Sequence, residues 1–370
     1  MLINNYSYLP ILCLKPAEMA ALEELPSKDK RLILPLISLK KWANSKSFIK
    51  SIQRIEKAVG DNYWIADLDK DFLELAKQRV EDGEDGVSAE FVKLADPLNG
   101  YRNWVDFISD NEHVIPTLQL RNISSIDEQL NNLSAIDKVI VVRFELSGEH
   151  AIETADFSYV VRKLSGRKFL NGLIIILDYG DFNRFNLIEY YKYSNLVRQL
   201  NTLIPDAYFC VSGTSFPYSF AGSYRGEIPI YERQIFNKVA SDCKEVKLIY
   251  SDRGSTRALA NDGGSGTPPP RIDYPLKNDW RFIRKELDSD SSDKEELYQD
   301  AAIEIINSDY WNPELRLWGT QMIEKTSLGD PYGITSANRA TAVRINLHIY
   351  QQLHYYDVLD LLDTEEDWVD

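Results

Sequence analysis

A succession of short apolar runs, each followed by polar or charged residues, is the feature that most limits how this chain can fold. The runs are rich in aliphatic and β-branched residues and are nearly continuous, without alternation between apolar and polar positions. Continuous apolar strands are typical of a parallel sheet that is covered on both faces. Eight runs predict strands at residues 8–14, 32–38, 63–68, 114–120, 139–144, 173–178, 207–212 and 246–251.

The segments between these runs have helical periodicity. In residues 47–59, for example, Phe48, Ile52 and Val59 fall on one apolar stripe. Strands that alternate with helices over about 250 residues have the size and order of a (β/α)8 barrel, so we predict a TIM-barrel-like α/β fold. A doubly wound α/β sheet is the alternative, but the glycine-rich first turn typical of that fold is absent after the first predicted strand.

The chain is longer than such a barrel requires. Residues 79–112, between the third and fourth predicted strands, should add further helices. We assign residues 1–257 to the barrel and residues 258–270, which are rich in glycine, serine and proline, to a flexible loop. Residues 271–370 should form a C-terminal extension, a β-hairpin followed by helices, that packs on the barrel.

Composition excludes several classes of protein. The net charge of −15 makes long tracts of nucleic acid poor partners, because the chain as a whole repels phosphate backbones. There is no apolar run of the length that spans a membrane and no secretory leader, so we expect a cytoplasmic protein without a membrane partner. The cysteines, Cys13, Cys210 and Cys243, lack CxxC spacing and are expected to be buried thiols.

Charged residues gather where the predicted strands end. The loops after the carboxyl ends of the strands build the site in a (β/α)8 barrel, so these side chains should converge at one mouth. Ionised groups in such a place are desolvated and would pair with one another even if nothing bound there. Apolar residues in these positions would make the fold at least as stable, however. The large number of charges therefore favours a ligand. The candidates are Lys15, Asp67, Arg121, Arg143, Glu145, Asp178, Asp252 and Arg253, with Arg271, Arg281 and Arg284 from the hairpin.

Three kinds of chemistry fit these residue types. Carboxylates could hold Mg²⁺ while cations neutralise a phosphate, which would give metal-dependent phosphoester hydrolysis. Two carboxylates on adjacent strands could instead act as acid and base on a glycoside. Arginines could also bind an anionic small molecule without turnover, which leaves open whether the protein is an enzyme. The catalytic candidates are Glu145, Asp178 and Asp252, the metal ligands Asp67, Asp178 and Asp252, and the anion-binding residues Lys15, Arg121, Arg143, Arg253, Arg271 and Arg281.

Histidine-based catalysis is poorly supported. No nucleophile elbow, Walker A or HExxH motif is present. His348, with Arg339 and Arg344, lies in a predicted C-terminal helix, and these residues could reach toward the mouth. Helical spacing favours the other interpretation, in which they form a salt-bridged surface and a packed histidine.

Several segments, spread over nearly the whole chain, resemble one known family. They are Tyr8-x-Pro10 with Lys15, LILPLIS (32–38), YSDRGS (250–255), PPPRIDYPLKNDWRFIRKE (268–286) and NRATAVRINLHI (338–349). Together they resemble the beta protein family, which is named from a bacteriophage protein. Members often carry a Gly-Asp-Tyr-like triplet where this chain has Ser251, Asp252 and Arg253, so only the aspartate can be carried over.

The resemblance implies a setting in phages or mobile elements but transfers no enzymatic activity. We therefore predict a phage- or defence-associated cytoplasmic protein with a site for an anionic, phosphate-bearing small molecule at the mouth of the barrel. Metal-dependent phosphoester hydrolysis is its predicted chemistry if it is an enzyme. The alternative is a non-catalytic interaction subunit that recognises a phage or host protein.

Overall fold

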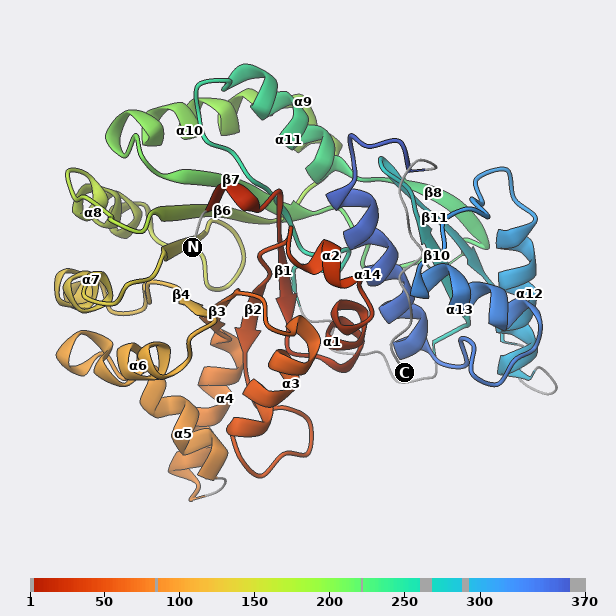
Figure 1. Cartoon of the computed structure of the whole chain (residues 1–370), viewed down its shortest axis with the longest axis horizontal. Coiled ribbons are helices and arrows are strands. Elements are labelled where there is room, and N and C mark those ends of the chain that lie inside the picture. The colour runs from red at the N-terminus through yellow and green to blue at the C-terminus, as the bar shows by residue number, and fades with distance from the viewer. Residues whose placement is uncertain (1–2, 84–85, 221, 260–267, 288–292, 360–370) are drawn as a thin grey trace.

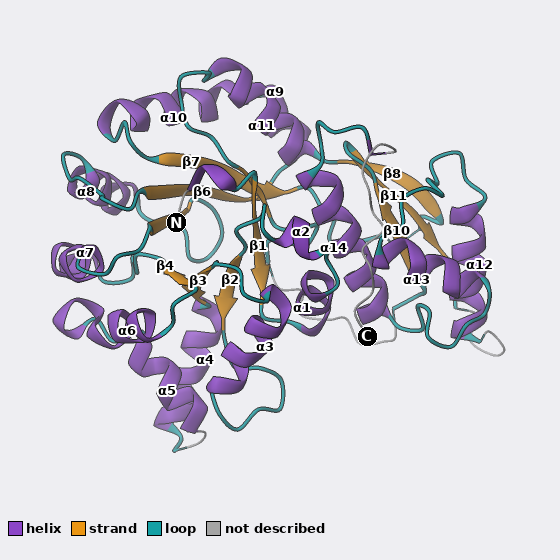
Figure 2. Cartoon of the chain, viewed as in Figure 1, coloured by secondary structure: helices purple, strands orange, loops and turns teal. Residues whose placement is uncertain are grey.

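The computed structural model describes residues 3–83, 86–220, 222–259, 268–287 and 293–359, so most of the predicted loop at 258–270 lies outside the described residues. The chain has an α/β fold. Parallel strands surrounded by helices form one part of the molecule, and a smaller antiparallel sheet with its own helices lies beside them (Figure 1, Figure 2).

The predicted strands are all present, with ends that differ by a few residues. Two parallel sheets contain them, one in the order β4-β3-β2-β1-β9 and one in the order β5-β6-β7. The strands are β1 (Tyr8–Cys13), β2 (Leu36–Leu39), β3 (Trp64–Leu68), β4 (Val114–Pro116), β5 (Ile140–Glu145), β6 (Leu173–Asp181), β7 (Tyr208–Thr214) and β9 (Tyr250–Asp252).

Single parallel bridges connect the two sheets. Thr117, which follows β4, pairs with Val141 of β5. Phe209 of β7 pairs with Leu248, which lies just before β9. The backbone N–H of Leu118 donates to the carbonyl of Val141 at 2.7 Å. β4 ends at Pro116, and the N–H of the next residue, Thr117, still donates to the carbonyl of Ala66 in β3 at 3.1 Å. Each strand of this part therefore lies next to the strand that precedes or follows it in the chain.

Helices connect the parallel strands and cover them, as the periodicity predicted. Two of them, α5 and α6, come from residues 79–112, where additional helices were expected. The helices of this part are α1 (Pro16–Glu23), α2 (Ser27–Lys30), α3 (Ile49–Val59), α4 (Lys70–Glu81), α5 (Gly86–Leu94), α6 (Leu98–Asp110), α7 (Ile126–Ser134), α8 (Thr154–Leu164), α9 (Arg184–Ile188), α10 (Tyr191–Leu203) and α11 (Tyr231–Asp242).

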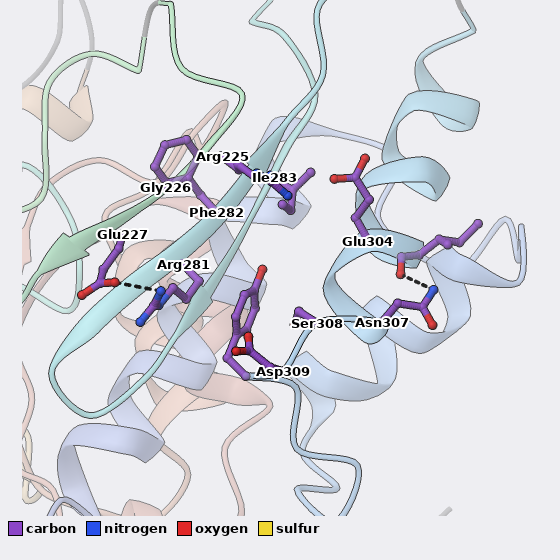
Figure 3. A pocket seen from close by; sticks show the side chains of 12 residues that line it. Arg225, Gly226, Glu227, Arg281, Phe282, Ile283, Glu304, Asn307, Ser308 and Asp309 are labelled. Atoms are coloured by element: carbon purple, nitrogen blue, oxygen red, sulfur yellow. Dashed lines mark hydrogen bonds and ion pairs between the residues drawn. The ribbon is translucent and has the colours of Figure 1, made fainter.

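The C-terminal part contains the predicted hairpin and one strand that the sequence did not reveal. β10 (Arg271–Pro275) and β11 (Asp279–Arg284) pair antiparallel, and β11 also pairs with β8 (Arg225–Pro229), which lies between β7 and α11 in the chain. A cavity of about 600 Å³ separates the outer end of this sheet from α12 (Lys294–Ile306), and in it Arg281 forms an ion pair with Glu227 (Figure 3). Helices α13 (Trp318–Ser327) and α14 (Ala337–Leu353) complete this part.

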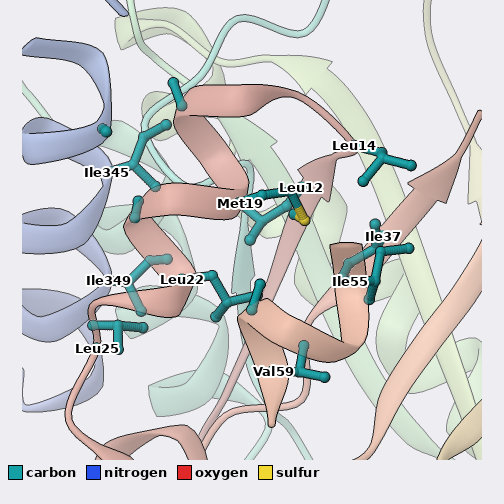
Figure 4. Close-up of a cluster of buried hydrophobic side chains, with 14 of the residues drawn as sticks. Leu12, Leu14, Met19, Leu22, Leu25, Ile37, Ile55, Val59, Ile345 and Ile349 are labelled. Carbon is teal, nitrogen blue, oxygen red and sulfur yellow. The ribbon is translucent and has the colours of Figure 1, made fainter. Parts of the chain in front are cut away.

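Helix α14 joins the two parts of the molecule. It packs against α1 and against β10, and 12 of its 17 residues are buried. Figure 4 shows Ile345 and Ile349 of α14 on the side that faces Leu22 of α1 and Leu25, which follows α1. Beyond its exposed first turn, α14 therefore runs through the interior of the protein. Its polar residues, among them Arg344 and His348, are therefore held inside the molecule.

The cysteines and the absence of a membrane span were the two remaining expectations. Cys210 and Cys243 are buried thiols as expected, and Cys13 is half-buried. Within the described ranges, no helix combines the length and the apolar character that a membrane span requires.

Candidate functional site

Arg143 is the centre of an ionic network at the carboxyl ends of β3, β5 and β6. Its Nη1 lies 2.9 Å from Oδ2 of Asp67, and its Nη2 lies 2.7 Å from Oδ2 of Asp178. Nη2 also lies 3.2 Å from Oε1 of Glu145. The strands place these groups together because their parallel carboxyl ends meet at one edge, with Arg143 and Asp178 on neighbouring strands β5 and β6.

Two further cations complete this network. Nη2 of Arg253 lies 2.7 Å from Oδ2 of Asp178, and Lys70 forms an ion pair with Glu145. Burial by itself would raise the pKa of Asp178, but Arg253, Arg143 and the N–H of Gly180 lower it to about 2. Three carboxylates therefore face three cations, and the network is electrically balanced. Its arginines have no unpaired positive charge left for a phosphate.

Asp252 belongs to a different, fully buried network. Its Oδ1 accepts from the hydroxyl of Tyr8 and, at 2.7 Å, from the N–H of Gly254. Its Oδ2 accepts from the Tyr250 hydroxyl at 2.7 Å and lies 2.8 Å from Nε2 of His348. The indole of Trp280 donates to Nδ1 of His348 at 3.2 Å, so His348 carries its proton on Nε2 and donates to Asp252. With four donors and no exposed surface, Asp252 has no access to a ligand.

The proposed metal ligands are thus divided between these two networks. Asp67 and Asp178 lie on either side of Arg143, and Asp252 contacts α14. No group of three or more histidine, cysteine, aspartate or glutamate side chains in the described part of the chain is arranged to hold a metal ion.

The remaining predicted residues lie outside the network around Arg143. Lys15 is exposed beyond the end of β1, and Arg121 forms an ion pair with Glu74 at 2.5 Å. Arg281 lines the cavity of Figure 3, where its guanidinium is bound by Glu227 at 2.8 Å and Asp279 at 2.6 Å. That cavity is lined by three acids and two arginines, so it offers no net attraction to an anion.

A second cavity, which we call the arginine pocket, has a different charge. It has a volume of about 380 Å³ and lies where the loops after β7 and β9 meet β10, β11, α12 and α14. Among the residues that line it, four are arginines and one is a carboxylate. They are Arg257, Arg271, Arg284 and Arg344, with Asp273.

Asp273 holds two of the arginines in place. It is 2% exposed, and its Oδ2 accepts from Nη1 of Arg344 at 2.8 Å and from Nη2 of Arg271 at 3.0 Å. Aromatic rings support both guanidinium groups, since Arg271 lies 3.5 Å from the ring centre of Phe220 and Arg344 lies 4.0 Å from that of Phe216. Stacking on an aromatic face fixes the plane of a guanidinium while its N–H groups stay available.

The cations of the pocket repel one another. Burial, together with Arg271 and Arg257, lowers the pKa of Arg344 to about 10, although Asp273 opposes this shift. Burial and the charge of Arg271 likewise lower the pKa of Arg257, whose Nε donates to the carbonyl of Pro217 at 3.0 Å. A bound anion would relieve this repulsion. Arg284 is in a different position, because it also pairs with the exposed Glu286.

Of the arginines in this pocket, Arg271 was among the predicted anion-binding residues, and Arg284 was among the charged residues expected at the mouth. The register of the hairpin brings these two together, because Arg271 lies directly opposite Arg284. Two like charges at opposed positions destabilise a strand pair unless something else compensates them. Arg344 was considered from the sequence together with His348, four residues further along the same helix, but the burial of Arg344 was not predictable from this spacing.

Comparison with known proteins finds two matches. The Beta protein family model matches residues 8–354, a range that includes all the arginines of the pocket. "Protein beta" of Enterobacteria phage P4 is 30% identical over 367 residues, which cover 96% of this chain and 95% of that protein.

Proposed function

This chain belongs to the beta protein family, and we propose that it is a phage- or defence-associated protein that binds a small phosphate-bearing anion in the arginine pocket. We further infer that β1 to β7 and β9 form a TIM-barrel-like (β/α)8 arrangement, supported by the two parallel bridges between the sheets. The pocket would then lie at the margin of the mouth, beside the loops that follow β7 and β9.

The excess of positive charge in the pocket carries this proposal. The whole chain has a net charge of −15, yet four guanidinium groups line one cavity together with a single carboxylate. Guanidinium groups form paired hydrogen bonds with phosphate oxygens, and arginine is the usual residue for this purpose. A volume of about 380 Å³ lies within the range of small-molecule sites, which favours one sugar phosphate or nucleotide over a polymer.

The network around Arg143 would support this pocket without contacting the ligand. Arg253 donates to Asp178 and also, at 3.3 Å, to the carbonyl of Ala258, next to Arg257. The network therefore anchors the loop that carries one pocket arginine. Binding without turnover has more support than phosphoester hydrolysis, because the carboxylate that lines the pocket, Asp273, is already bound by two arginines.

Thermal melting with matched ligands tests the proposal. The wild type, Arg257→Gln and Arg281→Gln are melted with sugar phosphates, nucleoside monophosphates and their unphosphorylated counterparts, with and without Mg²⁺. Arg281→Gln is the control, since it removes an arginine from the other cavity. A phosphate compound at 100 times its Kd should add about 2.7 kcal/mol to the free energy of unfolding of the wild type and of the control.

We expect Arg257→Gln to lose most of this stabilisation. If no phosphate compound stabilises the wild type, or if Arg281→Gln loses the effect equally, the pocket does not bind phosphate. A search for a protein partner would then be the next step. A requirement for Mg²⁺ would instead favour the metal-dependent chemistry.

A further inference from the structure

We infer that the arginine pocket selects a phosphomonoester in its dianionic form over a phosphodiester. This inference rests on the proposed function and adds the chemical class of the ligand. A terminal phosphate group would occupy the pocket, and an internal phosphate with a substituent on either side would bind weakly.

The balance of charges facing the pocket leads to this conclusion. Arg257, Arg271, Arg284 and Arg344 face it from the loop after β9, from β10, from β11 and from α14. Asp273 compensates one positive charge from inside, and Glu286 compensates that of Arg284 from the exposed side. Among the described residues, two positive charges therefore remain uncompensated.

The other ionisable groups that face the pocket are neutral. They are Tyr218, from the loop after β7, and Tyr298, from α12. Burial raises the pKa of Tyr298 to about 12, and burial also raises the pKa of Tyr218. Both phenols can donate or accept hydrogen bonds without changing the net charge.

A phosphomonoester matches this excess of two charges. At neutral pH it carries a charge of about −1.5 to −2, because its second pKa is about 6, and it presents three terminal oxygens. A phosphodiester carries a single negative charge and has one terminal oxygen fewer. It would leave one guanidinium both desolvated and uncompensated, which is costly in a partly buried site.

The amino terminus of α14 adds to the preference for concentrated negative charge. Ala337, the first residue of this 17-residue helix, lines the pocket. The first turn of a helix has N–H groups without partners inside the helix and carries a partial positive charge. Phosphate groups bind at such ends, and here the helix end and the arginines face the same cavity.

Arg257 is the arginine best suited to test the preference. It forms no ion pair with any carboxylate in the described part of the chain, and its Nε is bound by a backbone carbonyl. Its replacement therefore breaks no salt bridge. Arg344, by contrast, is buried and holds Asp273, so its loss would disturb folding.

The experiment measures the affinities of phenyl phosphate and methyl phenyl phosphate by calorimetry at pH 7.5 and pH 5.0. We expect the monoester to bind at least about tenfold more tightly at pH 7.5, and we expect this ratio to fall at pH 5.0, where the monoester has gained a proton. The pocket itself should keep its charge over this range, since arginines stay protonated and since Arg271 and Arg344 hold the pKa of Asp273 low against the effect of burial.

In Arg257→Gln the affinity for the monoester should fall more than that for the diester, and in Arg281→Gln neither should change. Equal affinities for the two esters in the wild type at pH 7.5 would overturn the inference and leave the proposed function intact. The absence of binding by both esters would overturn the proposed function as well.

Discussion

Replacing Glu232 with glutamine should make the stability of this protein much less dependent on pH. Glu232 is 1% exposed in the first turn of α11, and its Oε2 accepts from the N–H of Ser215 at 3.0 Å and from the Ser215 hydroxyl. Its Oε1 has no hydrogen-bond partner in the described structure. Burial, and secondarily the charge of Asp252, raise the pKa of Glu232 to about 8, so this side chain is a neutral acid at neutral pH.

The sign of the effect follows from proton linkage. An unfolded glutamate loses its proton near pH 4.5, whereas Glu232 keeps its proton in the folded protein up to about pH 8. Between these limits the folded state binds more protons, so stability falls as the pH rises. One pKa unit corresponds to about 1.4 kcal/mol, and this side chain should therefore remove roughly 4 to 5 kcal/mol of stability across the interval.

Urea denaturation at pH 5.0 and pH 7.5 measures this contribution. The wild type should lose about 3 kcal/mol more than Glu232→Gln between these two pH values. The glutamine places an amide N–H₂ where Oε1 has no partner, at a cost of about 1 to 3 kcal/mol that does not vary with pH. The dependence on pH, and not the absolute stability, is therefore the quantity to compare.

Glu56→Gln is the matched control, since Glu56 is exposed on α3. It should follow the pH dependence of the wild type. If Glu232→Gln and the wild type lose the same free energy of unfolding between pH 5.0 and pH 7.5, the reasoning is refuted, and Glu232 is ionised in the folded protein.

Three further substitutions test the buried networks by urea denaturation. Arg143→Met should destabilise the protein by about 3 to 5 kcal/mol, because Asp178 and its neighbours lose their central cation; a loss below about 1 kcal/mol would contradict this. Asp252→Asn should cost about 1 to 3 kcal/mol through mismatched hydrogen bonds, with phosphate affinity unchanged, and loss of affinity in a stable variant would assign Asp252 to the site. Gly254→Ala should cost about 1 to 3 kcal/mol, since Gly254 has φ of +55° and a Cβ there would lie 2.7 Å from Leu12; unchanged stability would show that the turn relaxes.

The parallel strands were predictable because their signal is local. The run LIIILD at 173–178 is apolar at every position before its final aspartate, as expected of a strand buried on both faces, and it forms most of β6. β8 (Arg225–Pro229) was missed for the opposite reason. It is an edge strand with largely exposed residues, and RGEIP contains no apolar run. Its pairing with β11 depends on a partner about 50 residues away.

For the charged residues predicted at the strand ends, the sequence indicated which of them lie close together but not which way each side chain points. Asp178 and Arg253 were expected to converge because they follow parallel strands, and they form an ion pair. Asp252 and Arg253 are adjacent in sequence, but successive residues of a strand point to opposite sides. The side chain of Asp252 therefore lies against α14, and that of Arg253 contacts Asp178.

The sequence by itself determined the α/β class, the order of the parallel strands and the edge at which charged residues gather, because apolar patterning and chain connectivity encode all three. Only the tertiary structure decided which of those charges are compensated. Arg257, Arg271, Arg284 and Arg344 come from separate elements, and one cavity collects them around a single carboxylate, whereas Arg143 and Arg253 are balanced by acids. Charges in water are screened within about 10 Å, so whether an arginine remains available for a ligand depends on its neighbours in space and not on its neighbours in sequence.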